Sequence, residues 1–70
     1  MLREQLDRLV DELVTKGVQL EDAQREFEKR FIAHVLAKSG GSLCKAVDLL
    51  GMHRNTLSRK ITEYRLRRSA

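Results

Sequence analysis

The sequence predicts an all-α fold of four helices, the last two of which form a helix-turn-helix. The 70-residue chain contains no proline, and Leu, Glu, Arg, Lys and Ala, which favour helices, dominate its composition. Apolar residues recur at intervals of three and four along four segments, with glycines between them. No segment shows the strict apolar–polar alternation of a half-buried strand.

The first expected helix covers residues 2–16 and carries a continuous apolar stripe. At 100° per residue the stripe occupies an arc of roughly 140°, and it consists of Leu2, Leu6, Leu9, Val10, Leu13 and Val14. Gly17 ends the helix. Because no earlier segment can cover the stripe, we expect it to pack on the next helix, on another subunit or on both. The opposite side is mixed in sign, which favours a protein interface over a membrane-surface helix.

The second expected helix covers residues 20–38 and has apolar residues on two sides. Phe27 and Phe31 lie on one stripe, whereas Ile32 and Leu36 extend the apolar surface around the other side. This pattern indicates a helix packed between two partners, namely the downstream helix-turn-helix and a dimer interface that includes the first helix. Residues 39–41, Ser-Gly-Gly, form the corner after it.

A chain of this length buries little apolar surface alone, so dimerisation is one way for it to become stable. We therefore assign residues 1–38 to dimerisation within a single domain that covers residues 1–70. The predicted dimer interface consists of Leu6, Leu9, Leu13, Phe27 and Phe31.

The helix-turn-helix is predicted over residues 42–64. Ser42 is a good N-cap for the first short helix, and Gly51 stands where that helix must stop. In the second helix Leu57, Ile61 and Tyr64 fall on one side, facing a core. Its other positions are polar or basic, and Asn55, Arg59 and Thr62 point away from that core. Such side chains suit the reading of base edges and phosphates.

The basic charge is concentrated in the same half of the chain. Residues 1–38 hold seven basic and eight acidic side chains, whereas residues 39–70 hold seven basic and only two acidic ones. A polyanion is therefore the expected partner of the second half, and residues 65–70 are expected to form a fraying basic tail.

Other classes of function find little support in the residues. One cysteine and two histidines without ligand spacing argue against a metal site, and no acid–base pair or activated nucleophile can be assembled. Cys44 is expected to be a small packing residue rather than a redox sensor. We expect no cofactor, no small-molecule substrate and no catalysis. The longest apolar runs are two or three residues, so we expect a cytoplasmic, nucleoid-associated protein with no membrane contact.

These features together resemble the Fis family of bacterial DNA-binding proteins, especially the Fis-type domain that ends NtrC-type transcriptional activators. The specific part of the resemblance is the segment Leu-Gly-Met-His-Arg-Asn-Thr-Leu at residues 50–57. It is supported by the Phe-Glu-Lys-Arg-Phe-Ile run at residues 27–32 and is weak over the first helix. Cys44 departs from the family, which usually has Ser or Thr there.

The resemblance implies an intertwined homodimer in which the first two helices form the subunit interface and the last two bind the major groove. It also implies that DNA bends to receive both recognition helices, so that deformability contributes to site choice. Carried over by position, Arg54, Thr56 and Arg59 would be the principal DNA contacts, with Lys60 and Ser42 near phosphates. The complete predicted DNA-contacting set is Arg54, Asn55, Thr56, Ser58, Arg59, Lys60, Ser42 and Lys45.

The leading hypothesis is a sequence-selective, DNA-bending domain that acts in transcriptional regulation as a homodimer and can contact the transcription machinery. The alternative is an oligomerisation or protein-docking module whose basic face meets an acidic protein partner. The two differ in the response of binding to salt, because phosphate contacts release counterions.

Overall fold

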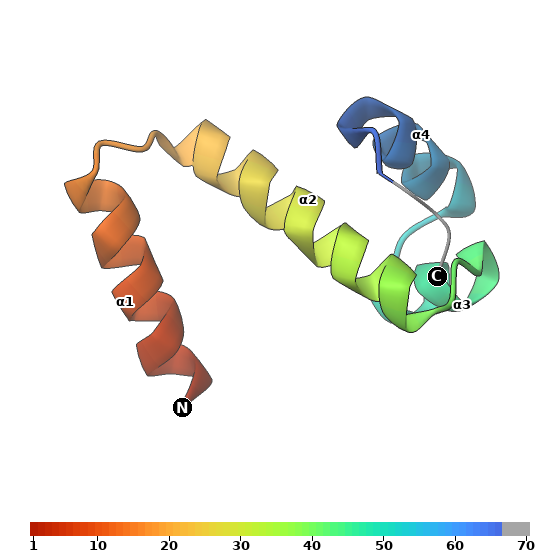
Figure 1. Cartoon of the computed structure of the whole chain (residues 1–70), viewed down its shortest axis with the longest axis horizontal. Coiled ribbons are helices and arrows are strands. Elements are labelled where there is room, and N and C mark those ends of the chain that lie inside the picture. The colour runs from red at the N-terminus through yellow and green to blue at the C-terminus, as the bar shows by residue number, and fades with distance from the viewer. Residues whose placement is uncertain (67–70) are drawn as a thin grey trace.

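The computed structural model describes residues 1–66, which form four helices and no strand (Figure 1). The helices are α1 (Leu2–Thr15), α2 (Leu20–Lys38), α3 (Leu43–Leu50) and α4 (Arg54–Tyr64). This confirms the all-α prediction and the helix-turn-helix. Within the described part, no helix is both long and apolar enough to cross a membrane.

Helix α1 is separate from the rest of the protein. It lies at one end of α2, at an angle to it, and has no buried residue (Figure 1). Gly17 ends the turn after α1 with a φ of 77°, and the Val18 amide donates to the carbonyl of Leu13. This bond and the left-handed glycine form the usual helix C-terminal motif. The predicted apolar stripe therefore exists in α1 but is not buried by any other part of residues 1–66.

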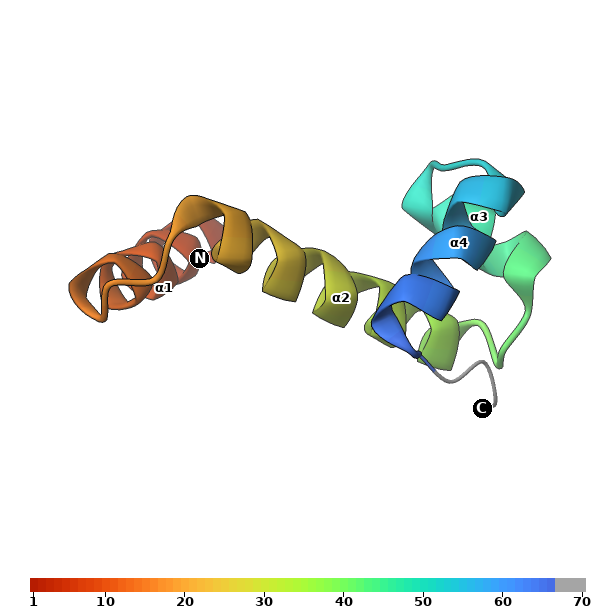
Figure 2. The same ribbon diagram turned by 90° about the horizontal axis from the view of Figure 1, so that it is seen from above.

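The core lies at the other end of α2, where α3 and α4 pack (Figure 2). Ile32 and Leu36 of α2 are each 1% exposed, and Leu57 of α4 is completely buried. The core is completed by Leu43, Ala46 and Ile61. As predicted, α2 therefore turns one apolar side toward the helix-turn-helix.

The radius of gyration and the accessible surface area both indicate an incompletely packed chain. The radius of gyration is 13.7 Å, whereas a compact chain of this length would have roughly 11 Å. The accessible surface is 6037 Å², against about 4,500 Å² for a folded monomer of this mass. An excess on the order of 1,500 Å² is what an uncovered interface would leave exposed.

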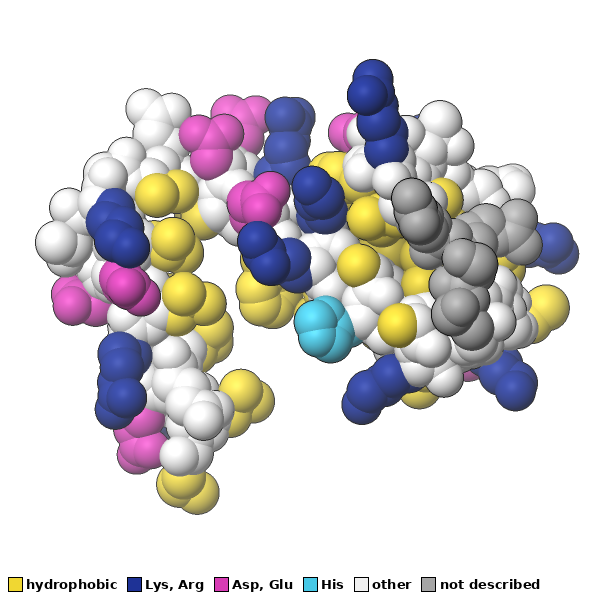
Figure 3. Space-filling model, viewed as in Figure 1, with side chains coloured by type: hydrophobic (Ala, Val, Ile, Leu, Met, Phe, Trp, Pro, Cys, Tyr) yellow, Lys and Arg dark blue, Asp and Glu magenta, His cyan; other side chains and the backbone are white. Residues whose placement is uncertain are grey.

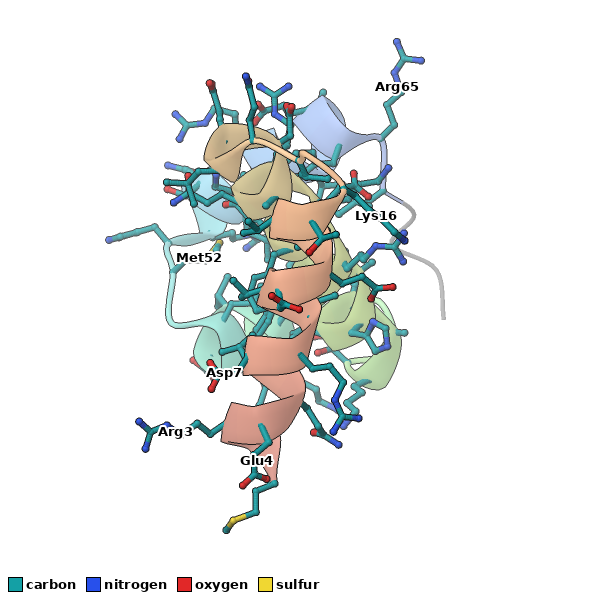
Figure 4. The ribbon with its side chains drawn as sticks, turned by 90° about the vertical axis from the view of Figure 1, so that its left-hand side faces the viewer. Arg3, Glu4, Asp7, Lys16, Met52 and Arg65 are labelled. Carbon is teal, nitrogen blue, oxygen red and sulfur yellow. The ribbon has the colours of Figure 1, made fainter. Side chains whose placement is uncertain are left out.

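The beginning of the expected basic tail is ordered against the core. Arg65 adopts a left-handed conformation with a φ of 54°, and the Leu66 amide donates to the Ile61 carbonyl at 2.9 Å. Leu66 is half-buried and packs on the core cluster, whereas the Arg65 side chain points into solvent (Figure 4). The expectation of a fraying tail is thus wrong for Leu66, and residues 67–70 lie outside the described residues.

Candidate nucleic-acid interface

The turn between α3 and α4 is built by local hydrogen bonds that the sequence specifies. The Ser42 hydroxyl accepts from the Lys45 amide at 3.3 Å and caps α3, as predicted. Gly51 has a φ of 68°, and its amide donates to the Val47 carbonyl at 2.8 Å. Met52 follows, half-buried against the core, and is seen in the turn in Figure 4. These contacts fix where α4 begins.

Helix α4 exposes polar residues in its first turn and on the side opposite its core residues. Arg54, Asn55, Ser58 and Arg59 are exposed, and Thr56 is half-buried. None of the salt bridges within residues 1–66 involves Arg54 or Arg59. Both guanidinium groups are therefore free to meet an external anion, and both come from the half of the chain that carries the basic excess.

The start of α3 contributes a second group of polar residues. Lys45 is exposed, and Ser42 is half-buried with its oxygen already engaged as a cap acceptor, which leaves its proton available as a donor. Cys44 is exposed, so the expectation that it is a small packing residue is wrong within the described part of the chain. His53 occupies the N-cap of α4 without making a side-chain cap bond.

Lys60 differs from the other predicted DNA contacts. Its ammonium forms an ion pair with Oε1 of Glu28 on α2, and its side chain is only 22% exposed. At 100° per residue Lys60 lies about 60° from Leu57, on the flank of the inward side rather than on the outer face. The structure therefore places Lys60 against its own protein, whereas Arg59 lies on the outer face and Arg54, about 60° from Leu57 on the other flank, is exposed in the first turn.

Glu28 also accepts a hydrogen bond from the Tyr64 hydroxyl, at 2.8 Å to Oε2. We call Glu28, Lys60 and Tyr64 the Glu28 network. The hydrogen bond from Lys60, followed by that from Tyr64, lowers the pKa of Glu28. In return the hydrogen bond to Glu28 raises the pKa of Lys60 and of Tyr64. All three directions favour the charged carboxylate and ammonium and the neutral phenol that the geometry requires.

Sequence reasoning missed the Glu28 network, although a signal for it exists. Glu28 precedes Ile32 by four residues and Leu36 by eight, which places it on the stripe of α2 that faces α3 and α4. A carboxylate on such a stripe needs a cation or a donor opposite it. Lys60 and Tyr64, on the inner side of α4, are the residues that supply them.

A second candidate surface is an apolar groove between α1 and α2. It has a volume of about 640 Å³, and its apolar lining is visible on the inner sides of both helices in Figure 3. The Phe27 and Phe31 rings lie 5.8 Å apart in a tilted arrangement. Four predicted interface residues, Leu9, Leu13, Phe27 and Phe31, line the groove. Leu6, the fifth, is 46% exposed on α1.

The groove is lined by both apolar and polar side chains. Leu9 and Phe31 are each about half exposed, at 46% and 49%. The polar lining residues are Asp22, Glu26, Arg30 and His34 of α2. In residues 1–66 no three His, Cys, Asp or Glu side chains lie close enough to hold a metal ion.

Comparison with known proteins gives one finding. Residues 23–64, more than half of the chain, match the sequence model of the Fis family of bacterial regulatory proteins. The matched range begins within α2 and ends with α4, so it contains the buried core, the Glu28 network and the exposed face of α4. No curated protein and no solved structure gives a match.

Proposed function

The chain belongs to the Fis family of bacterial regulatory proteins, and from this premise we propose that it is a sequence-selective DNA-binding domain acting as a homodimer. The observation that carries the proposal is the exposed face of α4, where Arg54 and Arg59 are free of protein partners within the described residues. The match to a family of helix-turn-helix regulators supports duplex DNA as the partner, and so does the basic charge of the second half of the chain.

In the proposed complex α4 lies in the major groove. Its N-terminal residues, Arg54, Asn55 and Thr56, meet base edges and the adjacent phosphates, as in other helix-turn-helix proteins. Ser58 and Arg59 extend the contact by one turn, and Ser42 and Lys45 reach the phosphate backbone from the start of α3. Arginine is suited to this role because its planar group can donate two hydrogen bonds to one guanine.

The exposed apolar surfaces of α1 and α2 support the proposal of a homodimer. Helix α1 buries none of its residues, and the groove beside Phe27 and Phe31 is open. The excess surface, on the order of 1,500 Å² per chain, is of the size that stable dimers bury. We propose that a second copy of the chain occupies the groove, so that residues 1–38 serve dimerisation and residues 42–64 serve DNA binding.

A homodimer would present two copies of α4 to one duplex. If the two helices stand closer together than one turn of straight DNA, the duplex bends to receive both, and the flexibility of the central bases adds to selectivity. A regulator of this kind would lie with bacterial DNA in the cytoplasm, where it can affect transcription.

A titration of labelled duplex at several salt concentrations tests the DNA assignment. About 6 phosphate contacts predict that log affinity falls with log salt with a slope near −5. Measuring fluorescence anisotropy between low and physiological salt gives that slope. A flat response, or binding to an acidic protein that equals binding to duplex, would instead support the docking module.

A further inference from the structure

We propose that Glu28 is a positioning residue that fixes the direction of the recognition helix α4 relative to the dimerisation helix α2. The proposal rests on the proposed function. It goes beyond it by assigning a role to a side chain that belongs neither to the predicted DNA-contacting set nor to the predicted dimer interface.

The contacts of Glu28 hold α4 at two points. One carboxylate oxygen pairs with Lys60 and the other accepts the Tyr64 hydroxyl hydrogen bond at 2.8 Å. Lys60 and Tyr64 are one helical turn apart, a separation of about 6 Å along the α4 axis. A single contact would leave α4 free to swing about it, whereas two contacts on one rigid carboxylate restrict both tilt and rotation.

The remaining contacts leave this task to Glu28. Helix α3 packs directly against both α2 and α4, and side chains of α2 and α4 share the core cluster. The buried Leu57 and Ile61 hold α4 on the core through the hydrophobic effect, which is non-directional, whereas a hydrogen bond depends on the angle between donor and acceptor. Within residues 1–66, the Glu28 network provides the polar side-chain bonds that join α2 to α4.

Glu28 is also adjacent to the predicted dimer face. It follows Phe27 directly and precedes Phe31 by three residues on the same helix, so the side of α2 that orients α4 is rigidly tied to the side that would meet the partner. In a twofold dimer any change in the angle between α2 and α4 occurs in both subunits. The distance between the two recognition helices, and thus the preferred half-site spacing, would change accordingly.

The test compares Glu28→Gln with wild type on duplexes whose half-sites are set at a series of spacings. Glu28→Gln is expected to lower affinity at the best spacing roughly tenfold, the equivalent of one charge-assisted hydrogen bond. It should also flatten the dependence on spacing, while affinity for a single half-site changes little. Glu21→Gln is the matched control, because Glu21 is exposed in the first turn of the same helix.

The direction in which Glu28→Gln changes DNA affinity distinguishes the positioning role of Glu28 from an alternative role. In the alternative, Lys60 can contact a DNA phosphate, and its ion pair with Glu28 only prevents this contact. Glu28→Gln would then free Lys60 and strengthen binding to every DNA sequence. Stronger binding, or an unchanged spacing preference, would overturn the positioning role. Tyr64→Phe, which keeps the ion pair, should also flatten the dependence on spacing, and it serves as the test if Glu28→Gln does not fold. Failure of the wild type to bind any duplex would refute the proposed function instead.

Discussion

Replacing Arg54 or Arg59 with alanine is expected to abolish most DNA binding while leaving the helical protein intact. Both side chains are exposed on α4, and neither takes part in a salt bridge within the described residues, so their removal leaves the core unchanged. A lost bidentate contact weakens binding by about 1–3 kcal/mol per half-site, so a homodimer should lose roughly 2–6 kcal/mol. Gel shifts with a specific duplex measure this loss.

The matched control for both variants is Arg3→Ala. Arg3 is an exposed arginine on α1 that points away from the rest of the protein in Figure 4, and its replacement removes the same charge. It should retain nearly wild-type affinity, with a small loss from long-range attraction at low salt. Wild-type affinity in both α4 variants would remove the assignment of α4 as the reading helix. Equal losses of affinity in all three variants would mean that these arginines contribute only through the net charge of the protein.

Replacing Leu9 with aspartate is expected to dissociate the dimer. Leu9 lines the apolar groove between α1 and α2, and the core that holds α3 and α4 does not include it. In a dimer, two copies would each lose apolar contact and desolvate a carboxylate, a penalty of at least about 3 kcal/mol, or a roughly 100-fold weaker association. Sedimentation velocity measures the association, and circular dichroism checks that the helices remain.

Leu49→Asp provides the control for this substitution. Leu49 is 63% exposed on α3, outside the groove, so the same chemical change should leave the mass of the protein in solution unaltered. Dissociation by both variants would indicate a general loss of folding rather than loss of one interface. A dimer that survives Leu9→Asp would mean that the subunits meet somewhere other than this groove.

Local structure in the helix-turn-helix could be predicted because short-range rules determine it. The Ser42 cap and the left-handed Gly51 follow from the chemistry of single residues. The burial of Leu57 and Ile61 follows from helical periodicity. In contrast, the left-handed conformation at Arg65, which returns Leu66 to the core, could not be predicted, because residues other than glycine seldom adopt it.

Long-range contacts were harder to predict. The resemblance, carried over by position, predicts Lys60 near phosphates, whereas its angular position places it beside Tyr64 on the inner flank of α4. Its partner, Glu28, lies 32 residues earlier, and no local rule pairs the two. The direction of α1 relative to α2 could not be predicted either, because no part of the described residues buries the apolar stripe of α1.

The central claim is that two chains, joined through α1 and α2, place two α4 helices on one duplex. The most direct measurement is sedimentation equilibrium of the wild-type chain, alone at micromolar concentration and then bound to a duplex with two half-sites. We expect twice the 8.1 kDa chain mass for the free protein and two chains on each duplex. A single 8.1 kDa species in solution that binds the duplex as one chain with full affinity would contradict it.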